Sequence, residues 1–351
     1  MIQVKLTELS EFCISALTKA GVNEANAKIV SDVLITTDTF GVLSHGTKNL
    51  YQYILKMREN GLNATAEPAI EKEGVSWAII NGNNAIGMLS SYKAMKTAIE
   101  KAKQTGIAYA GVYNSCHFGA AGYYANMAAR EGLIGLSMSN ADPNMAIPNS
   151  ADVVIGNNPF SFAAPLPGGE SVFLDIALSN VAALKVVMAK EKGEKVSKEW
   201  LIDSEGEPTD DPSGFPYNSH LRSMAAHKGY GLAVMVEILA SVITGAGVLR
   251  EVPSWNLDMK SKNNAGHAFI AIDVSQFIAD KAFYNRMMQM VNELHAAPKA
   301  KKASRIFVPG EMEWEKRKKA LSCGMLEITD AMAENYKKLS ELFEIEIQIY
   351  S

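Results

Sequence analysis

Apolar side chains recur with a helical period over the first sixty residues of the chain. From Leu6 to Gly21 they return every three or four residues, and the pattern resumes from Asn23 to about Gly41. A third such stretch runs from about Leu50 to Gly61. Because Asn23 is a suitable N-cap and Gly21 a suitable stop, we expect three amphipathic helices, with the polar turn Leu43–Asn49 before the third.

Shorter apolar runs alternate with helical patterns beyond residues 63–74, a polar segment containing Pro68 that we interpret as a linker. Such alternation is typical of an α/β region. The expected elements are strands at Trp77–Ile80, Ile107–Tyr113 and Leu133–Met138, and helices at Gly87–Gln104 and Gly119–Gly132.

The second half of the chain is less regular. Residues 141–159 are rich in Asn, Pro and Gly and are expected to form a long functional loop, while 193–219 are expected on the surface. The run Gly231–Val248 approaches membrane-spanning length, but Glu237 in its middle favours a buried helix in a globular core. Further expected elements are strands at Val172–Ala177 and Phe269–Ile272, and helices at 180–192, at 276–296 and twice after Glu311.

Composition narrows the class of ligand. The 351 residues carry a formal net charge of -4 with 21% charged residues, so no general basic field would hold nucleic acid or an anionic membrane. A small molecule is the expected partner. Three cysteines without C-x-x-C spacing fit a reducing compartment, and no secretory leader pattern opens the sequence. A cytoplasmic protein is therefore expected.

Several common catalytic signatures are missing from the sequence. It contains no G-x-G-x-x-G between a strand and a helix, which argues against a standard Rossmann site. It also contains no Walker, H-E-x-x-H or G-x-S-x-G motif. The six histidines include no i, i+4 pair, so no metal site is expected.

His117 is the first candidate for chemistry, because it lies where the expected strand 107–113 gives way to a helix. Imidazole transfers protons near neutral pH, and a nearby helix N-terminus would lower its pKa and keep it neutral. A structural loop histidine would give the same pattern. The neighbouring Cys116 is expected to be a buried thiol rather than a nucleophile. Together with His117, polar residues at the edges of apolar runs suggest a cleft lined from several segments: Ser44, His45, Asn140, Asp142, Asn158, Asp175 and Lys228.

Dispersed motifs also place the chain near a known family. They stand in the order and approximate spacing of the malate/L-lactate dehydrogenase family that is unrelated to classical lactate dehydrogenase, and the chain resembles that family over nearly its whole length. Its pattern is closest to the ureidoglycolate dehydrogenase members. The motifs are Ser44-His45-Gly46, the run from His117 to Tyr124, Gly156-Asn157-Asn158-Pro159, Leu174-Asp175-Ile176-Ala177, Lys228-Gly229-Tyr230-Gly231 and Val308-Pro309-Gly310-Glu311.

The resemblance implies a fold and a set of partners. It implies an α/β fold in which NAD or NADP binds to an atypical, non-Rossmann sheet domain, with a helical lobe built from both terminal segments. Residues 1–70 would form the N-terminal helical lobe, 71–300 the cofactor-binding domain, and 301–351 C-terminal helices packed on that lobe. A homodimer is also implied.

The resemblance further implies roles for single residues. His117 matches the proposed acid/base, and Ser44 and His45 match the catalytic pair on the substrate side. Ala141 falls where the ureidoglycolate enzymes have a cofactor-contacting serine, so only its main chain could serve. Residues assigned to the substrate are Lys48, Asn49, Tyr53 and Asp142. Those assigned to the cofactor are Asn140, Ala141, Asn158, Pro159, Asp175, Ile176, Ala177, Lys228, Gly229, Pro309, Gly310 and Glu311.

One position departs from the family pattern. Members usually carry an arginine three residues after Gly46, whereas this chain has Asn49 there, beside Lys48. An arginine would grip a substrate carboxylate with two hydrogen bonds. Here Lys48 could replace it as a point charge, another basic residue could reach in, or the substrate could present an amide or hydroxyl instead. The resemblance implies an oxidoreductase for a small 2-hydroxy or 2-oxo acid. Reduction of a cyclic imino acid, or a cofactor-binding protein without turnover, remain alternatives.

Overall fold

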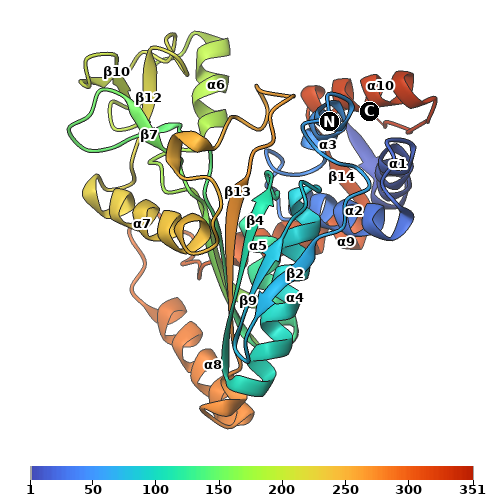
Figure 1. Ribbon diagram of the computed structural model, residues 1–351. Coiled ribbons are helices and arrows are strands. Elements are labelled where there is room, and N and C mark those ends of the chain that lie inside the picture. Colours follow the sequence, from blue (N-terminus) through green and yellow to red (C-terminus); the bar gives the residue numbers. More distant parts are fainter. Residues whose placement is uncertain (1, 351) are drawn as a thin grey trace.

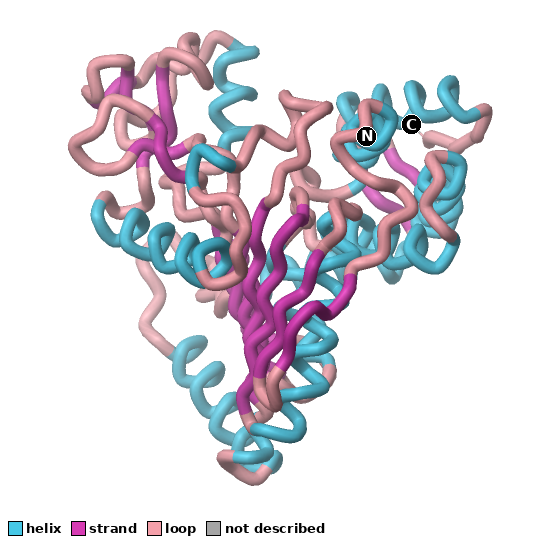
Figure 2. Tube along the Cα trace, in the orientation of Figure 1, coloured by secondary structure: helices cyan, strands magenta, loops and turns pink. Residues whose placement is uncertain are grey.

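A seven-stranded sheet occupies the middle of the molecule (Figures 1 and 2). The computed structural model describes residues 2–350. The strand order is β2-β3-β4-β13-β5-β8-β9, in which β3 and β4 run parallel and the other neighbours antiparallel. The strands are β2 (Ala69–Glu73), β3 (Trp77–Asn81), β4 (Ile107–Ser115), β5 (Ile134–Ser139), β8 (Phe160–Pro165), β9 (Ser171–Ile176) and β13 (Ala265–Ile272).

Helices cover both faces of this sheet. On one face lie α4 (Gly87–Thr105) and α5 (Ala121–Arg130), whose buried small and apolar residues pack on β4 and β5 (Figure 1). On the other face lies α7 (His227–Glu237), which continues as a turn of π-helix, η2 (Ile238–Val242), against β13. Because both faces are covered, β4 and β13 are mostly buried and contain long runs of small and apolar residues.

The two ends of the chain build one helical lobe. Helices α1 (Leu6–Lys19), α2 (Glu24–Thr39) and α3 (Leu50–Arg58) pack with α9 (Glu311–Cys323) and α10 (Asp330–Phe343) (Figure 1). The short strand β1 (Gln3–Lys5) pairs antiparallel with β14 (Met325–Glu327). The Asn23 side chain accepts a hydrogen bond from the amide of Asn26, as expected for a helix cap.

A smaller sheet stands apart from the central one, in the order β11-β10-β12-β6-β7, and packs with α6 (Ala183–Lys192). Helix α8 (Asp280–Ala296) projects from the body as an arm, and of its residues only Val291 is buried (Figure 1). The small strands are β6 (Met145–Ala146), β7 (Val153–Ile155), β10 (Leu201–Asp203), β11 (Pro208–Thr209) and β12 (Ser219–Arg222).

The structure corrects three expectations. The linker 63–74 contains β2, an edge strand with every residue exposed, so it shows no apolar alternation. The expected loop 141–159 contains β6 and β7, which are too short for a periodic signal, whereas 193–219 is mostly exposed as expected and carries β10, β11 and the start of β12. The apolar helix from Gly231 is not enclosed: Leu232, Ile238 and Val242 are 41%, 47% and 57% exposed. In residues 2–350 no helix has the length and apolar character needed to cross a membrane.

Candidate active site

His117 is held by its neighbours in the turn between β4 and α5. Its Nδ1 lies 2.5 Å from the hydroxyl of Tyr53, a buried residue of α3, and 3.4 Å from the amide of Gly119. An amide N–H can only donate, so Nδ1 accepts in this arrangement and the ring proton belongs on Nε2. Since Tyr53 occupies the Nδ1 side, Nε2 is the nitrogen left to face a ligand.

Aromatic rings surround this imidazole. Trp255 stacks on His117 with the ring centroids 4.2 Å apart and the planes 14° from parallel. The same indole lies 5.2 Å from the ring of Tyr53, so it covers one face of the hydrogen-bonded pair. The ring of His45 stacks 5.6 Å from that of His117. Segments far apart in sequence thus supply one aromatic cluster.

The turn Ser44–Asn49 brings its own residues together with His117. The Ser44 hydroxyl lies 2.8 Å from Nδ1 of His45, and the Asn49 amide donates to the Ser44 carbonyl at 2.9 Å. Asn49 therefore closes the turn where the family has its arginine. Lys48 contributes its carbonyl, which accepts a hydrogen bond from Asn335. The ammonium of Lys48 is the nearest positive group in sequence to Asn49, the position where the family has its arginine.

A buried carboxyl fixes this turn from behind. Both the amide and the hydroxyl of Thr47 donate to Oδ2 of Asp38, at 2.9 and 2.5 Å, and the Thr47 hydroxyl also contacts the Tyr336 hydroxyl. A Cβ at Gly46 would lie 1.9 Å from Oδ1 of Asp38, so only glycine fits there. Burial raises the pKa of Asp38 to about 7.

Burial also governs the protonation of the imidazoles. The pKa of His117 is well below its ordinary value, first because the ring is desolvated and then because His45 and His267 lie close. The expected direction is confirmed, but the cause is not a helix terminus. The first-turn amide of Gly122 in α5 donates to Asp175 instead, at 2.9 Å. Burial raises the pKa of Asp142, and a hydrogen bond from Ser254 opposes that change.

Several of the residues assigned to the cofactor lie near the end of β9. The amide of Phe173 donates to the Pro309 carbonyl at 3.1 Å, which brings the start of α9 to the strand that carries Asp175 and Ile176. A Cβ at Gly310 would lie 2.6 Å from the Phe173 ring. The Glu311 carboxylate accepts from the Val308 amide and is paired with His295 at 2.8 Å.

The start of α7 reaches the same place. Leu178, which follows Ala177, accepts a hydrogen bond at its carbonyl from the Met224 amide at 2.8 Å. A Cβ at Gly229 would lie 2.4 Å from the Met224 carbonyl and 2.9 Å from that of Leu178. Lys228 stands beside this glycine in the first turn of the helix. Backbone therefore lines this corner of the molecule.

Asn140 and Asn158 belong to a buried polar network centred on Glu237. The amide of Asn158 donates to Oε2 of Glu237 at 2.8 Å, and that of Asn140 approaches Oε1 at 3.3 Å. Asn158 also accepts from the main chain of Ala141 at 3.0 Å, and the Pro159 carbonyl accepts from the Ser139 amide at 3.2 Å. Both asparagine amides are thus hydrogen-bonded inside the chain, and their contact with a cofactor stays a prediction.

The sequence did not single out four residues that shape the site. Trp255 and Lys56 gave no periodic or motif signal, and Glu237 was used only to argue against a membrane span. His267 is fully buried, lies 2.8 and 2.9 Å from the hydroxyls of Ser139 and Ser115, and stacks on Phe118.

Cys116 is a buried thiol whose pKa is raised to about 12, as expected of an inert cysteine. Within residues 2–350 no cluster of three His, Cys, Asp or Glu could hold a metal ion.

A weakly basic imidazole packed among aromatic rings is suited to proton transfer on a small molecule, which is the chemistry of an enzyme active site. The comparison with protein families agrees with this class. The model of the malate/L-lactate dehydrogenase family matches residues 4–336, and the chain belongs to that family.

Individual relatives extend over most of the chain. A malate dehydrogenase of Pyrococcus abyssi is 38% identical over 317 residues, which cover 88% of this chain and 86% of that protein. An NAD(+) ureidoglycolate dehydrogenase of Escherichia coli K12 is 32% identical, over 94% of this chain and 93% of its own. A crystal structure of malate dehydrogenase from Entamoeba histolytica superposes with a TM-score of 0.91 at 31% identity, covering 98% of both chains.

Proposed function

We propose that the chain transfers a hydride between NAD or NADP and a small 2-hydroxy acid or its 2-oxo counterpart, with His117 moving the accompanying proton. The observation that carries this proposal is the pair formed by His117 and Tyr53, which leaves one imidazole nitrogen free. The family and its named dehydrogenases give the reaction type, and their names include both NAD(+) and NADP(+) enzymes.

The residues around the end of β9 fit a nicotinamide cofactor. Gly229 and Gly310 stand where a Cβ would strike neighbouring protein atoms, so these glycines let the starts of α7 and α9 pack closely at this corner. The half-buried Asp175 offers a carboxylate for sugar hydroxyls, and the start of α9 offers main-chain amides for phosphate. When bound there, the cofactor would supply the hydride. We propose a non-Rossmann site within residues 71–300, completed by 309–311, which the largely antiparallel sheet supports.

His117 performs the proton step in both directions. Oxidation uses the other neutral tautomer, in which Nδ1–H donates to the Tyr53 hydroxyl and Nε2 accepts the proton of the substrate hydroxyl. During reduction, the imidazolium gives the Nε2 proton to the substrate oxygen. The depressed pKa of His117 makes the imidazolium a strong acid, which favours this second transfer. The Tyr53 hydroxyl serves every state of the ring because it can donate or accept.

The proposed substrates are 2-hydroxy acids of the malate, lactate or ureidoglycolate type, as in the family. The turn before α3 bears on how their carboxylate is bound. Because the Asn49 amide is used by the Ser44 carbonyl, we propose Lys48 as the positive group for the substrate carboxylate, with Tyr53 and Asp142 lining the site. A panel of 2-oxo acids and one cyclic imino acid, monitored by absorbance of the reduced cofactor, tests this. Turnover of the imino acid alone would favour a C=N reductase, and cofactor binding without turnover would favour an inactive scaffold.

Replacement of His117 tests the central assignment. His117→Asn should lower kcat by about 10²-fold or more, because the acid/base group is lost, and should leave cofactor affinity nearly unchanged. Cofactor affinity is measured from the fluorescence of the reduced nicotinamide. A variant with native kcat would overturn the role of His117. The matched control is His220→Asn, the same substitution on β12 of the smaller sheet, which should keep native kcat.

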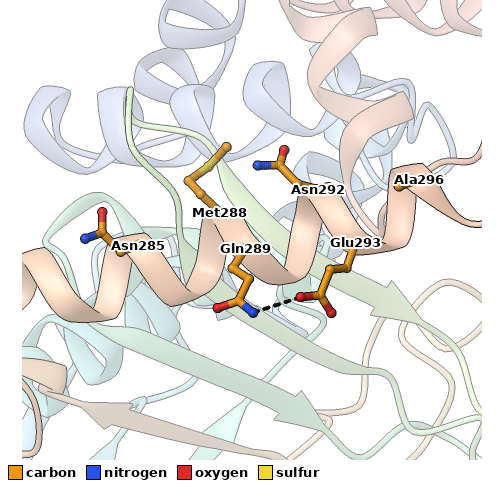
Figure 3. Close-up of a pocket in the computed structure, with 6 residues that line it drawn as sticks. All are labelled: Asn285, Met288, Gln289, Asn292, Glu293 and Ala296. Atoms are coloured by element: carbon orange, nitrogen blue, oxygen red, sulfur yellow. Dashed lines mark hydrogen bonds between the residues drawn. The ribbon is translucent and has the colours of Figure 1, made fainter.

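We propose that the protein forms a homodimer through α7, η2 and α8. Their exposed apolar side chains include Leu232, Ile238 and Val242. Figure 3 shows one open side of α8, which carries Asn285, Met288, Gln289, Asn292, Glu293 and Ala296. A projecting helix with one buried residue gains stability from a second copy of equal shape.

The oligomeric state can be measured by light scattering after size exclusion. A dimeric mass is expected for the native chain, and a monomeric mass for Ile238→Glu, because a carboxylate at an apolar contact is costly. A monomeric native chain would contradict the proposal.

The three free thiols fit a reducing compartment, so we also propose a cytoplasmic location.

A further inference from the structure

The loop 253–263 places Trp255 against His117, although no part of it belongs to a helix or strand of the central sheet. The indole covers the face of the imidazole and also packs along Tyr53. A stacked ring excludes water from one side of the imidazole and restricts rotation of its plane. The position of this loop therefore sets the environment of the proposed acid/base.

Lys56 holds this loop from the inside. Its ammonium donates to the carbonyls of Asp258 at 2.5 Å and Ser261 at 2.9 Å, and the side chain is completely buried. Neither partner is a carboxylate, and burial lowers the pKa of Lys56. A buried ammonium is expensive to desolvate, so its hydrogen bonds to the loop are the visible compensation. Lys56 lies one turn after Tyr53 on α3.

Other contacts hold the same loop at both ends. Gln52 donates to the Asn256 carbonyl at 3.0 Å, and Asn263 donates to the Pro253 carbonyl at 2.6 Å. Asn263 in turn accepts a hydrogen bond from the thiol of Cys116, the residue before His117. A Cβ at Gly61 would lie 2.1 Å from the Met259 carbonyl, so the end of α3 also fits closely against the loop. The loop is fixed, and Trp255 with it.

We propose that Trp255, held in place through the loop by Lys56, is a positioning residue that fixes the ring of His117 and keeps it dry for proton transfer. This rests on the proposed function of His117. Tyr53 binds the edge of the imidazole at Nδ1, whereas Trp255 acts on its face. Lys56 acts only through the loop.

Tyr53 and Lys56 on α3 are titratable groups close to His117 and Cys116, and further ones come from four other segments. His45 lies in the turn before α3, Cys116 precedes His117, and His267 lies on β13. Asp142 lies in the loop after β5, and its charge raises the pKa of Cys116. None of them is on loop 253–263. Removal of the indole therefore changes the hydration of His117 without removing a charged neighbour.

Histidine Cε1–H resonances followed by NMR against pH test the stack without any turnover, with His117→Asn used to identify the signal. In the native chain we expect the His117 signal shifted upfield by the indole and constant from about pH 5 to 8. In Trp255→Ala it should lose that shift and titrate at a higher pH than in the native chain, because the ring is less desolvated while His45 and His267 still lie close. Trp255→Phe should lie between the two. The control Trp77→Phe, at an exposed site on β3, should match the native chain.

Lys56→Met tests the loop. Its side chain has similar length but cannot donate, so the His117 signal should move in the direction seen for Trp255→Ala, although the residue lies outside the stack. A Lys56→Met chain that folds and keeps the native signal would overturn the role of Lys56. If that variant does not fold, Trp255→Ala still decides: an unchanged His117 signal overturns the proposal.

Turnover supplies a second readout. With saturating oxidised cofactor, kcat/KM for the 2-hydroxy acid should not fall between about pH 8 and 6 in the native chain, because His117 stays neutral. In Trp255→Ala it should fall toward the acid end of that range, because the less desolvated His117 becomes protonated at a higher pH. A flat profile in the variant contradicts the proposal. Failure of the proposed function is distinguishable: His117→Asn would then keep native turnover, while the NMR result would stand.

Discussion

Glu237 offers a direct test of how the buried network supports the site. Its Oε1 accepts from the Leu249 amide at 2.8 Å and from Asn140 at 3.3 Å, and its Oε2 accepts from Asn158 at 2.8 Å. The informative pair of variants is Glu237→Gln and Glu237→Leu. Glutamine keeps one oxygen but turns an amino group toward Asn158, whereas leucine removes every acceptor.

The structure gives the size of each effect. Asn140 keeps its hydrogen bond to the Gly247 carbonyl and Asn158 keeps that to Ala233, so only the Leu249 amide loses its single partner. An unsatisfied buried amide costs about 1–3 kcal/mol, and each weakened asparagine contact about 0.5–1.5 kcal/mol. Leucine should therefore lower the free energy of unfolding by about 4 kcal/mol. In the glutamine variant the new amino group faces the donating amide of Asn158, so the free energy of unfolding should fall by about 2 kcal/mol.

Urea unfolding followed by tryptophan fluorescence measures both variants. Glu251→Gln is the matched control, because Glu251 accepts the Val248 amide on the same loop at an exposed position and should change stability by less than about 0.5 kcal/mol. A leucine variant as stable as the native chain, or more stable than the glutamine variant, would refute the reasoning. Cofactor affinity measured on Glu237→Gln also tests whether Asn140 and Asn158 contact the cofactor, since a loss of about tenfold is expected if they do.

Two further perturbations address the proton-transfer pair and the turn behind it. Tyr53→Phe removes the hydroxyl on Nδ1 of His117 and should lower kcat about tenfold, the equivalent of one hydrogen bond of about 1.4 kcal/mol. Native kcat in steady-state assays would exclude Tyr53 from the proton step. Because burial raises the folded-state pKa of Asp38 to about 7, the folded chain holds a proton there that the unfolded chain releases near 3.8. Stability from Asp38 should therefore fall between about pH 4 and 7, and thermal melts of Asp38→Asn should lack that loss; identical pH profiles would contradict it.

Regular elements were accessible from the sequence where their periodicity was strong. The three N-terminal helices and the strand-to-helix turn at His117 are confirmed within a few residues, because burial of one helix face imposes spacing on the apolar side chains. The run after Gly231 was misread for a related reason. Apolar spacing reports that a face avoids water, but it does not say whether this chain covers that face. Leu232 and Val242 remain half exposed.

The site was only partly accessible. Ser44, His45, Tyr53 and His117 do meet, whereas Trp255 could not be foreseen, because its stacking depends on where a loop is held in space. Glu237 did carry a signal, since a single carboxylate inside an apolar helix must find partners. Those partners, Asn140 and Asn158, were singled out as candidate cleft and cofactor residues, and no spacing rule connects them to the helix that carries Glu237.

The joining of the two chain ends has a consequence for biosynthesis. Strand β1 pairs with β14, and the hydroxyl that backs Thr47 belongs to Tyr336. Synthesis proceeds from the N-terminus, and domains fold as they emerge. The central sheet is complete at β13, long before α10 has left the ribosome. A nascent chain would thus acquire its scaffold early and its finished substrate turn last, so premature release would yield a folded sheet without a competent site.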